Sequence, residues 1–468
     1  MKIRFVTLGC KLNFAESSAI GKALLEKGHT RAKQGEEADI CIINTCSVTD
    51  NADHKDRQAI HRIHRQNPNA IIIVTGCYAQ LQPEQVSKIE GVDYVLGQNE
   101  KYDITQLVDE IEQLRNSLED GVPSTGRSRN ELLAIGERRE AREGDEAMRR
   151  KGERREAKGE RICVGAIREV DEFHGVHSGD DRTRCFIKVQ DGCNYFCSYC
   201  TIPYARGKSR NPLISEVVAD AQKALQQGAK ELIITGVNIG DFGRSTGESF
   251  IELLRALDEL GDEAIRREAK GMDYRIRISS CEPNLLTDEI IDFVAHSKHF
   301  APHFHIPLQS GSNEVLKIMG RRYTRELFAE RVRHIKEAMP HAFIGVDCMV
   351  GVRGETQEYW EDYLEFIKGL EVSQLHVFTY SERANTRMLE MDLCVIPQAE
   401  RQRRSKILHA ISEEKTQTFY TQHAGRETVV LWESKKEGDQ MAGFTDNYIK
   451  VYRPYDKTKV NTFEVIRL

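Results

Sequence analysis

Three cysteines in the middle of the chain follow the spacing C-x3-C-x2-C: Cys193, Cys197 and Cys200. Thiolates this close together in sequence hold iron–sulfur clusters, or zinc when a fourth ligand is available. A structural zinc site needs four protein ligands, and the next cysteine and histidine downstream are Cys281 and His296. The spacing therefore favours a 4Fe–4S cluster on three cysteines, with one iron left open to another ligand.

Three more cysteines, Cys10, Cys46 and Cys77, each end a short apolar run in the first third of the chain. A helix-like segment follows each run, which indicates βαβ units and a parallel sheet. Ligands collect at the carboxyl ends of such strands, where helix N-termini favour thiolate. A buried cysteine at a strand end is more often a small apolar side chain, so each position is a weak signal by itself.

The length and composition of the chain limit the kinds of protein in which these cysteines can lie. The chain has 468 residues, a net charge of −6 and 12 cysteines, which suggests two to four domains. No apolar run approaches the roughly 18 residues that cross a bilayer, and the N-terminal run is too short for a signal peptide. Many cysteines without an export signal indicate a reducing compartment, so we expect a soluble, cytoplasmic protein without a membrane partner.

The order of predicted elements indicates an α/β fold. Six strand-and-helix repeats begin near Thr183 and predict a central (β/α)6 partial barrel, whose working face is the C-terminal end of its strands. The last segment reads as three short strands, at 428–432, 448–452 and 462–466, of a small all-β domain. The expected parts are an N-terminal parallel α/β sandwich (residues 1–115), a charged insertion and linker (116–178), the barrel (179–410) and the β domain (415–468).

Residues 119–161 are mostly charged, with mixed signs, and the hexapeptide R-R-E-A-K-G at 154–159 recurs at 266–271. Segments of this composition cannot bury enough apolar surface to order themselves. We interpret both as solvated inserted loops, because their nearly balanced charge argues against a nucleic-acid-binding arm.

The C-x3-C-x2-C motif resembles that of the radical S-adenosylmethionine (SAM) superfamily. In this superfamily the open iron binds SAM, and one electron cleaves SAM to a 5'-deoxyadenosyl radical. The segments around Cys10, Cys46 and Cys77 resemble the cluster motifs of the methylthiotransferases in this superfamily. Further similar motifs are K-V-Q-D-G at 188–192, H-I-P-L-Q-S-G at 305–311 and R-R-Y-T at 321–324. The resemblance implies two 4Fe–4S clusters, one on each cysteine set, and SAM as cofactors.

Lys11 and the segment P-Y-A-R-G at 203–207 most resemble the branch that methylthiolates N6-threonylcarbamoyladenosine, next to the anticodon of tRNA. The resemblance implies the tRNA anticodon stem-loop and a flavodoxin- or ferredoxin-type reductant as partners, and a TRAM-like C-terminal domain for RNA. Alternative substrates are isopentenyladenosine in tRNA and an aspartate of a ribosomal protein. An alternative of another class is a non-catalytic iron–sulfur protein that transfers electrons or binds RNA.

Further residues are candidates for binding SAM or RNA. Tyr199 matches an aromatic residue that superfamily members place beside the adenine, although simple packing would also explain it. The SAM candidates at barrel strand ends are Gly236, Asn238, Ser279, Ser280, Gln309 and Val350. Serine and asparagine at such ends also cap helices. The candidates for phosphate contacts are Arg321, Arg322, Lys435 and Lys436, although exposed charge pairs are commonly just solvated.

Overall fold

The computed structural model describes residues 1–33, 35–119, 162–165, 167, 173–175, 183–260 and 274–468. The charged insertion at 120–161 and the repeat at 266–271 lie outside the described residues. The chain forms two compact units. The first comprises Met1–Asp171 with Thr201–Lys208, and the second comprises Glu172–Cys200 with Ser209–Leu468.

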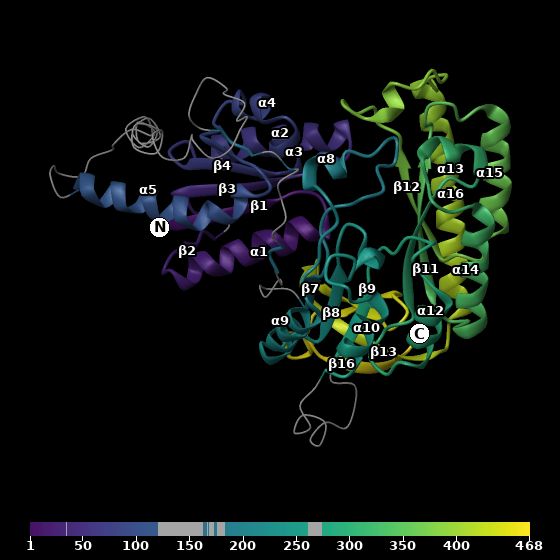
Figure 1. The fold of residues 1–468 in the computed structure, drawn as a ribbon. Helices are drawn as coiled ribbons and strands as arrows, with labels where there is room; N and C mark the ends of the chain where they lie inside the picture. The colour runs from purple at the N-terminus through teal and green to yellow at the C-terminus, as the bar shows by residue number, and fades with distance from the viewer. Residues whose placement is uncertain (34, 120–161, 166, 168–172, 176–182, 261–273) are drawn as a thin grey trace. The chain divides into compact units, whose positions relative to one another are not determined.

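The first unit is a six-stranded parallel sheet in the order β2-β1-β3-β4-β5-β6, with helices on both faces (Figure 1). Its strands are β1 (Lys2–Thr7), β2 (Thr30–Arg31), β3 (Ile40–Thr45), β4 (Ile71–Gly76), β5 (Tyr94–Leu96) and β6 (Ile162–Cys163). Its helices are α1 (Lys11–Glu26), α2 (Asp50–Gln66), α3 (Cys77–Leu81), α4 (Pro83–Ser87), α5 (Ile104–Glu119) and α8 (Ile202–Arg206).

Alternating side chains on the central strands build two cores in this unit. Ile40 and Ile42 of β3 pack with residues of α1 and α5 on one face. Cys41 and Ile43 pack with residues of α2, α3 and α4 on the other. Strands that are buried on both faces read as continuous apolar runs, which is why the sequence revealed them. The predicted N-terminal parallel sandwich is confirmed.

The second unit contains two three-stranded parallel sheets, β7-β8-β9 and β10-β11-β12, which a bridge from Ser280 to His305 connects. The strands are β7 (Arg184–Lys188), β8 (Glu231–Thr235), β9 (Arg275–Ile278), β10 (His303–Gln309), β11 (Phe343–Val350) and β12 (Gln374–Thr379). The helices around them are α9 (Ile214–Gln226), α10 (Phe250–Asp258), α12 (Asp288–His296), α13 (Asn313–Met319), α14 (Arg325–Ala338) and α15 (Gln357–Gly369). The predicted (β/α)6 partial barrel is confirmed.

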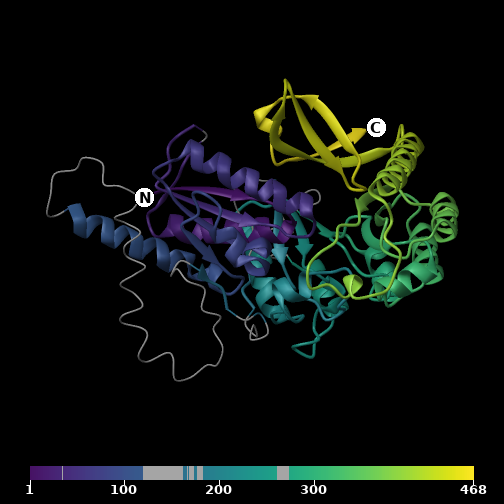
Figure 2. The same cartoon turned by 90° about the horizontal axis from the view of Figure 1, so that it is seen from above.

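A long helix, α16 (Gln398–Gln422), leads from the barrel to a four-stranded antiparallel sheet, β15-β14-β13-β16, drawn in yellow in Figure 2. Its strands are β13 (Glu427–Glu437), β14 (Gln440–Thr445), β15 (Lys450–Pro454) and β16 (Phe463–Arg467). The small all-β domain is confirmed, and β14 is a strand that the sequence analysis missed. A Cβ on Gly443 would lie 2.4 Å from Cγ1 of Val430 on β13, so the residue that weakens the strand signal is required for close packing.

Among the described residues, no helix is both long enough and apolar enough to cross a membrane.

Candidate functional site

In the first unit, the three N-terminal cysteines lie at the carboxyl ends of neighbouring strands, as expected. Cys10 is the N-cap residue of α1, Cys46 directly follows β3, and Cys77 is the first residue of α3 after β4. Strands β1, β3 and β4 are adjacent in the sheet. The strand order therefore brings together positions that are far apart in the sequence.

Two glycines allow the backbone to approach closely at these strand ends. Gly9 has a φ of 96°, and a Cβ there would lie 2.5 Å from Cβ of Cys46. Gly76 has a φ of 100°, and a Cβ there would lie 2.4 Å from the carbonyl oxygen of Thr45. Both positions favour glycine for conformational and for steric reasons, so the turns that carry Cys10 and Cys77 depend on it.

The three thiols also interact electrostatically. Burial, together with the neighbouring Cys77 and Cys10 thiols, raises the pKa of Cys46 to about 12. Burial raises the pKa of Cys77 as well, and the nearby Arg206 guanidinium opposes this shift. Because neighbouring thiolates destabilise each other, the sulfur atoms lie close enough to interact electrostatically. Bound metal would overcome this destabilisation, because metal coordination deprotonates a thiol.

A 4Fe–4S cluster does not require its cysteine ligands to converge on one point. No group of three metal-ligating side chains in the described parts of the chain converges tightly enough to hold one metal ion. In a cluster each thiolate binds a different iron, so the sulfur atoms need not converge on one point. The three thiols lie at the strand ends expected for such ligands, and their assignment to a 4Fe–4S cluster stays a prediction.

In the second unit, Cys193, Cys197 and Cys200 lie in the loop that follows β7. Ser198 anchors this loop: its N–H donates to the carbonyl of Met319 at 2.9 Å, and its hydroxyl donates to the carbonyl of Ile318 at 2.7 Å. The loop also contains Phe196, which has a φ of 51° and is 44% exposed. An anchored loop between barrel strands can hold three thiols in fixed positions.

Arg321, which the sequence analysis assigned to RNA, points into this loop. Its Nη1 donates to Sγ of Cys197 at 3.2 Å and to the hydroxyl of Tyr199 at 3.3 Å. It also forms an ion pair with Glu282, and its side chain is only 4% exposed. Phosphate could not reach a guanidinium in this position. Arg321 therefore lies against the cysteine loop, where it holds Tyr199 beside the thiols.

Arg322, the neighbour of Arg321, is exposed but also contacts the loop. Its guanidinium lies 4.1 Å from the centre of the Tyr195 ring and donates to the carbonyl of Asn194 at 3.0 Å. Lys435 and Lys436 lie elsewhere, on the exposed part of β13. The four basic candidates are thus divided between the cysteine loop and the C-terminal sheet.

The strand-end candidates differ in what their side chains do. Asn238 is 3% exposed, and within the described part of the chain neither its amide nitrogen nor its amide oxygen has a hydrogen-bond partner. It precedes a short 3-10 helix, Ile239–Asp241, without capping it. A buried polar group without a partner is costly and rare in a folded protein. The capping explanation therefore fails for Asn238, and a bound ligand would account for the amide.

Gln190, which was not singled out from the sequence, positions the segment that contains Asn238. Its side-chain oxygen accepts from the N–H groups of Val237 and Asn238 at 2.9 and 2.8 Å. Its amide nitrogen donates to the carbonyl of Gly192 at 2.7 Å. A Cβ on Gly236 would lie 3.0 Å from the Gln190 carbonyl. The motif K-V-Q-D-G contained this residue, but only the fold shows that it links the ends of β7 and β8.

The other strand-end candidates have more ordinary surroundings. Ser279 is buried, and Ser280 lies with its hydroxyl 3.0 Å from Nδ1 of His305, whose Nε2 is 2.7 Å from Asp347. Gln309 has a φ of 66°, and Val350 is buried in the main hydrophobic core. The Ser280–His305–Asp347 chain was not predicted, because its successive residues are 25 and 42 positions apart in the sequence.

Two family descriptions match the chain. Residues 2–97 match the family described as Uncharacterized protein family UPF0004, and residues 187–367 match the Radical SAM superfamily.

Curated relatives are similar over almost the whole chain. The threonylcarbamoyladenosine tRNA methylthiotransferase MtaB of Bacillus subtilis (strain 168) is 35% identical over 96% of this chain and 89% of its own length. The protein of the same name from Aquifex aeolicus (strain VF5) is 32% identical over 97% of each chain. A tRNA-2-methylthio-N(6)-dimethylallyladenosine synthase from Pelotomaculum thermopropionicum is 29% identical over 95% of this chain and 88% of its own.

Among solved structures, the radical S-adenosylmethionine methyltransferase TsrM from Kitasatospora setae resembles this chain with a TM-score of 0.52. It is 16% identical, and the match covers 83% of this chain and 76% of TsrM. At this identity the likeness concerns the fold alone.

Proposed function

Because this chain belongs to the radical SAM tRNA methylthiotransferase family, we propose that it converts N6-threonylcarbamoyladenosine, 3' to the anticodon of tRNA, to its 2-methylthio form. The observation that carries the proposal is the second cysteine set. A radical SAM enzyme needs one set, Cys193, Cys197 and Cys200, and the second set, Cys10, Cys46 and Cys77 at three neighbouring strand ends, would hold a second cluster.

The cofactors of this family are SAM and two 4Fe–4S clusters. When bound, they supply one-electron cleavage of SAM and a sulfur atom for transfer, the chemistry that protein side chains cannot perform. In our proposal, the protein's own residues orient these groups and exclude water. Arg321 fixes the loop that carries Cys197 and Tyr199. Gln190 fixes the segment that carries Asn238. Gly9 and Gly76 allow the strand ends that carry the N-terminal thiols to lie close together.

The choice of adenosine modification is supported by the pattern of similarity. Five relatives named for threonylcarbamoyladenosine are 31–35% identical, whereas three named for dimethylallyladenosine are 26–29% identical. Lys11, next to the first cluster cysteine, supports the same choice. A strain without this gene should lack 2-methylthio-N6-threonylcarbamoyladenosine in mass spectrometry of its tRNA nucleosides. Loss of the 2-methylthio form of isopentenyladenosine instead would refute the substrate choice.

The remaining assignments follow from this reaction. We propose residues 1–115 as the methylthiotransferase domain, 179–410 as the radical SAM core and 415–468 as a TRAM-like RNA-binding domain, joined by the insertion and linker at 116–178. A flavodoxin- or ferredoxin-type protein would supply electrons, and the tRNA substrate suits a cytoplasmic location.

Replacing Asn238 by alanine should weaken SAM binding about tenfold, because its unpartnered amide would be satisfied by the ligand. Equilibrium dialysis of the reconstituted protein with labelled SAM measures this affinity. Asn313 is a matched control, since its side chain already donates to Glu326 at the surface. Equal affinities for the Asn238→Ala and Asn313→Ala proteins would remove Asn238 from the SAM site.

The C-terminal sheet offers a surface for RNA. Tyr452 and Tyr455 are 50% and 37% exposed, and Nζ of Lys436 lies 5.5 Å from the centre of the Tyr455 ring. Nζ of Lys450 lies 4.7 Å from the Tyr452 ring centre. Exposed aromatic rings beside cations suit stacking on unpaired bases and contact with phosphates.

Lys435→Gln and Lys436→Gln should each reduce the slope of log Kd for tRNA against log salt concentration by about 1, the effect of losing one phosphate contact. Fluorescence anisotropy with a labelled anticodon stem-loop over a range of salt concentrations gives this slope. Lys317→Gln, on α13 and paired with Glu314, is the control. An unchanged slope in both β13 variants would exclude phosphate contacts there.

A further inference from the structure

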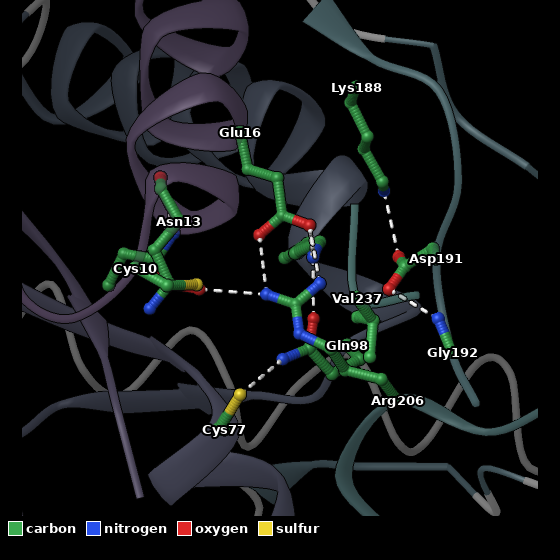
Figure 3. Close-up of polar contacts among 12 residues, drawn as sticks. Cys10, Asn13, Glu16, Cys77, Gln98, Lys188, Asp191, Gly192, Arg206 and Val237 are labelled. Atoms are coloured by element: carbon green, nitrogen blue, oxygen red, sulfur yellow. Dashed lines mark hydrogen bonds and ion pairs between the residues drawn. The ribbon is translucent and has the colours of Figure 1, made fainter. Parts of the chain in front are cut away.

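Among the buried charged side chains of the first unit, three contact one another. Glu16 is 0% exposed, and Lys101 and Arg206 are each 1% exposed. Nη1 and Nη2 of Arg206 lie 3.0 and 3.3 Å from the two Glu16 oxygens, and Nζ of Lys101 lies 2.6 Å from one of them. We call these residues the ion trio; Figure 3 shows Arg206 between Glu16 and Cys77.

The trio is connected to two of the N-terminal cysteines. Arg206 hydrogen bonds to Cys77 and lowers its pKa against the larger effect of burial. Gln98 donates to Sγ of Cys77 at 3.6 Å, and its oxygen accepts from Lys101 at 2.5 Å. The cations therefore reach Cys77 both directly and through Gln98.

Asn13 connects the trio to Cys10. Its amide nitrogen donates to the carbonyls of Leu8 and Thr45 at 2.8 and 2.9 Å, which fixes the direction of its oxygen. That oxygen accepts from Nη2 of Arg206 at 2.8 Å and lies 3.8 Å from Sγ of Cys10. Arg206 is thus held by a rigid set of partners at the thiol site.

Stability alone does not explain the ion trio. Removing charges from water is expensive, and apolar residues of the same volume usually stabilise a core as well as a buried ion pair does. The trio has two cations on one carboxylate, so it carries one net positive charge. A cluster with a two-plus core and three thiolates carries one net negative charge and gains another on reduction. The charge of the trio is therefore opposite to that of the cluster and favours its reduced state.

We propose that Glu16, Lys101 and Arg206 are positioning residues that raise the reduction potential of a 4Fe–4S cluster on Cys10, Cys46 and Cys77. The inference rests on the proposed function, since it requires that cluster. Net charge, hydrogen bonds to sulfur and solvent exposure set the potentials of such clusters. The trio supplies positive charge and, through Arg206 and Gln98, N–H donors to Cys77, in a setting where low dielectric strengthens both effects.

The test isolates this cluster in the full-length protein. In a parent protein with Cys193→Ala, Cys197→Ala and Cys200→Ala, only the N-terminal set can hold a cluster after anaerobic reconstitution with iron and sulfide. Electron paramagnetic resonance during a redox titration then gives its midpoint potential. The variants are Arg206→Gln, Lys101→Gln and Glu16→Gln. Lys27→Gln is the matched control, because it removes a cation from an exposed pair with Asp109.

We expect Arg206→Gln and Lys101→Gln to lower the midpoint potential enough to reduce the reduced-to-oxidised ratio at least tenfold, about 59 mV for one electron. Glu16→Gln should shift it upward, and Lys27→Gln should leave it unchanged because solvent screens the exposed charge. If Arg206→Gln fails to bind iron, Lys101→Gln decides the outcome, because Lys101 donates to Gln98, which in turn donates to Cys77.

Equal potentials for the parent, Arg206→Gln and Lys101→Gln would overturn the inference while leaving the cluster itself in place. A downward shift in Lys27→Gln as large as that in Lys101→Gln would also overturn it. A parent protein that binds no cluster would contradict the proposed function instead, so the two failures can be distinguished.

Discussion

Replacing Cys46 by alanine is expected to abolish methylthiolation while S-adenosylmethionine is still cleaved. Cys46 belongs to the N-terminal cysteine set, whereas the loop of Cys193, Cys197 and Cys200 and its anchor, Ser198, remain intact in this variant. Replacing Cys197 by alanine should abolish both activities, since we assign Cys197 as a ligand of the cluster that cleaves SAM. The reconstituted proteins are compared by chromatography of 5'-deoxyadenosine and by mass spectrometry of tRNA nucleosides.

The matched controls are buried cysteines that lie within strands rather than at their ends. Cys41 on β3 packs in the apolar core of the first unit, and Cys185 on β7 packs in that of the second. Cys41→Ala and Cys185→Ala should keep both activities. Methylthiolation by the Cys46→Ala protein would contradict the assignment of two clusters. Loss of SAM cleavage in that protein would contradict the assignment of SAM cleavage to the other cluster alone.

Glu231→Ala is expected to destabilise the second unit by about 3–5 kcal/mol, the usual cost of removing one partner from a buried ion pair. Glu231 is 0% exposed and lies 2.5 Å from Arg275 and 3.1 Å from Arg277. Both arginines also donate to carbonyls of the C-terminal sheet, including that of Thr445. Without Glu231, two buried guanidinium groups would lack their carboxylate where the barrel meets this sheet.

Urea unfolding followed by tryptophan fluorescence measures this loss of stability in the second unit. The chain has two tryptophans, and both Trp360 and Trp432 lie in the second unit. Glu289→Ala, which breaks the exposed pair with Arg255, should cost at most about 1 kcal/mol. Similar losses of unfolding free energy in Glu231→Ala and Glu289→Ala would show that the buried ion pairs of Glu231 stabilise the protein no more than an exposed pair does.

The same carboxylate predicts the effect of acid. Burial alone would raise the pKa of Glu231, but Arg275, Arg277 and Arg184 lower it to about 2. A depressed folded-state pKa stabilises the protein above the ordinary glutamate pKa of 4.5, and this stabilisation is lost as pH falls towards 2. The difference in stability between the original protein and Glu231→Ala should therefore be constant above about pH 5 and shrink below it.

Much of the fold could be predicted because its signals are local. The strands β3 and β4 are continuous apolar runs, and threonine N-caps mark the starts of helices such as α12 and α14. The strand β14 was missed, because a glycine interrupts it and its pairing with β13 depends on a distant residue, Val430.

The candidate site was predictable only in part. The six cysteines were visible from spacing and resemblance, and the sheet order accounts for the grouping of the N-terminal three. The direction of a long charged side chain is not encoded locally, so Arg321 was assigned to the surface although it lies against Cys197. Arg206 meets Glu16 across 190 positions, a pairing that no local pattern contains.

The most direct test of the account is product analysis of the reconstituted protein under anaerobic conditions. The protein is incubated with dithionite, SAM and tRNA that contains N6-threonylcarbamoyladenosine and isopentenyladenosine, both without the methylthio group. We predict 5'-deoxyadenosine together with 2-methylthio-N6-threonylcarbamoyladenosine in the digested tRNA. Methylthiolation of isopentenyladenosine alone, or the absence of both 5'-deoxyadenosine and any methylthiolated nucleoside, would contradict it.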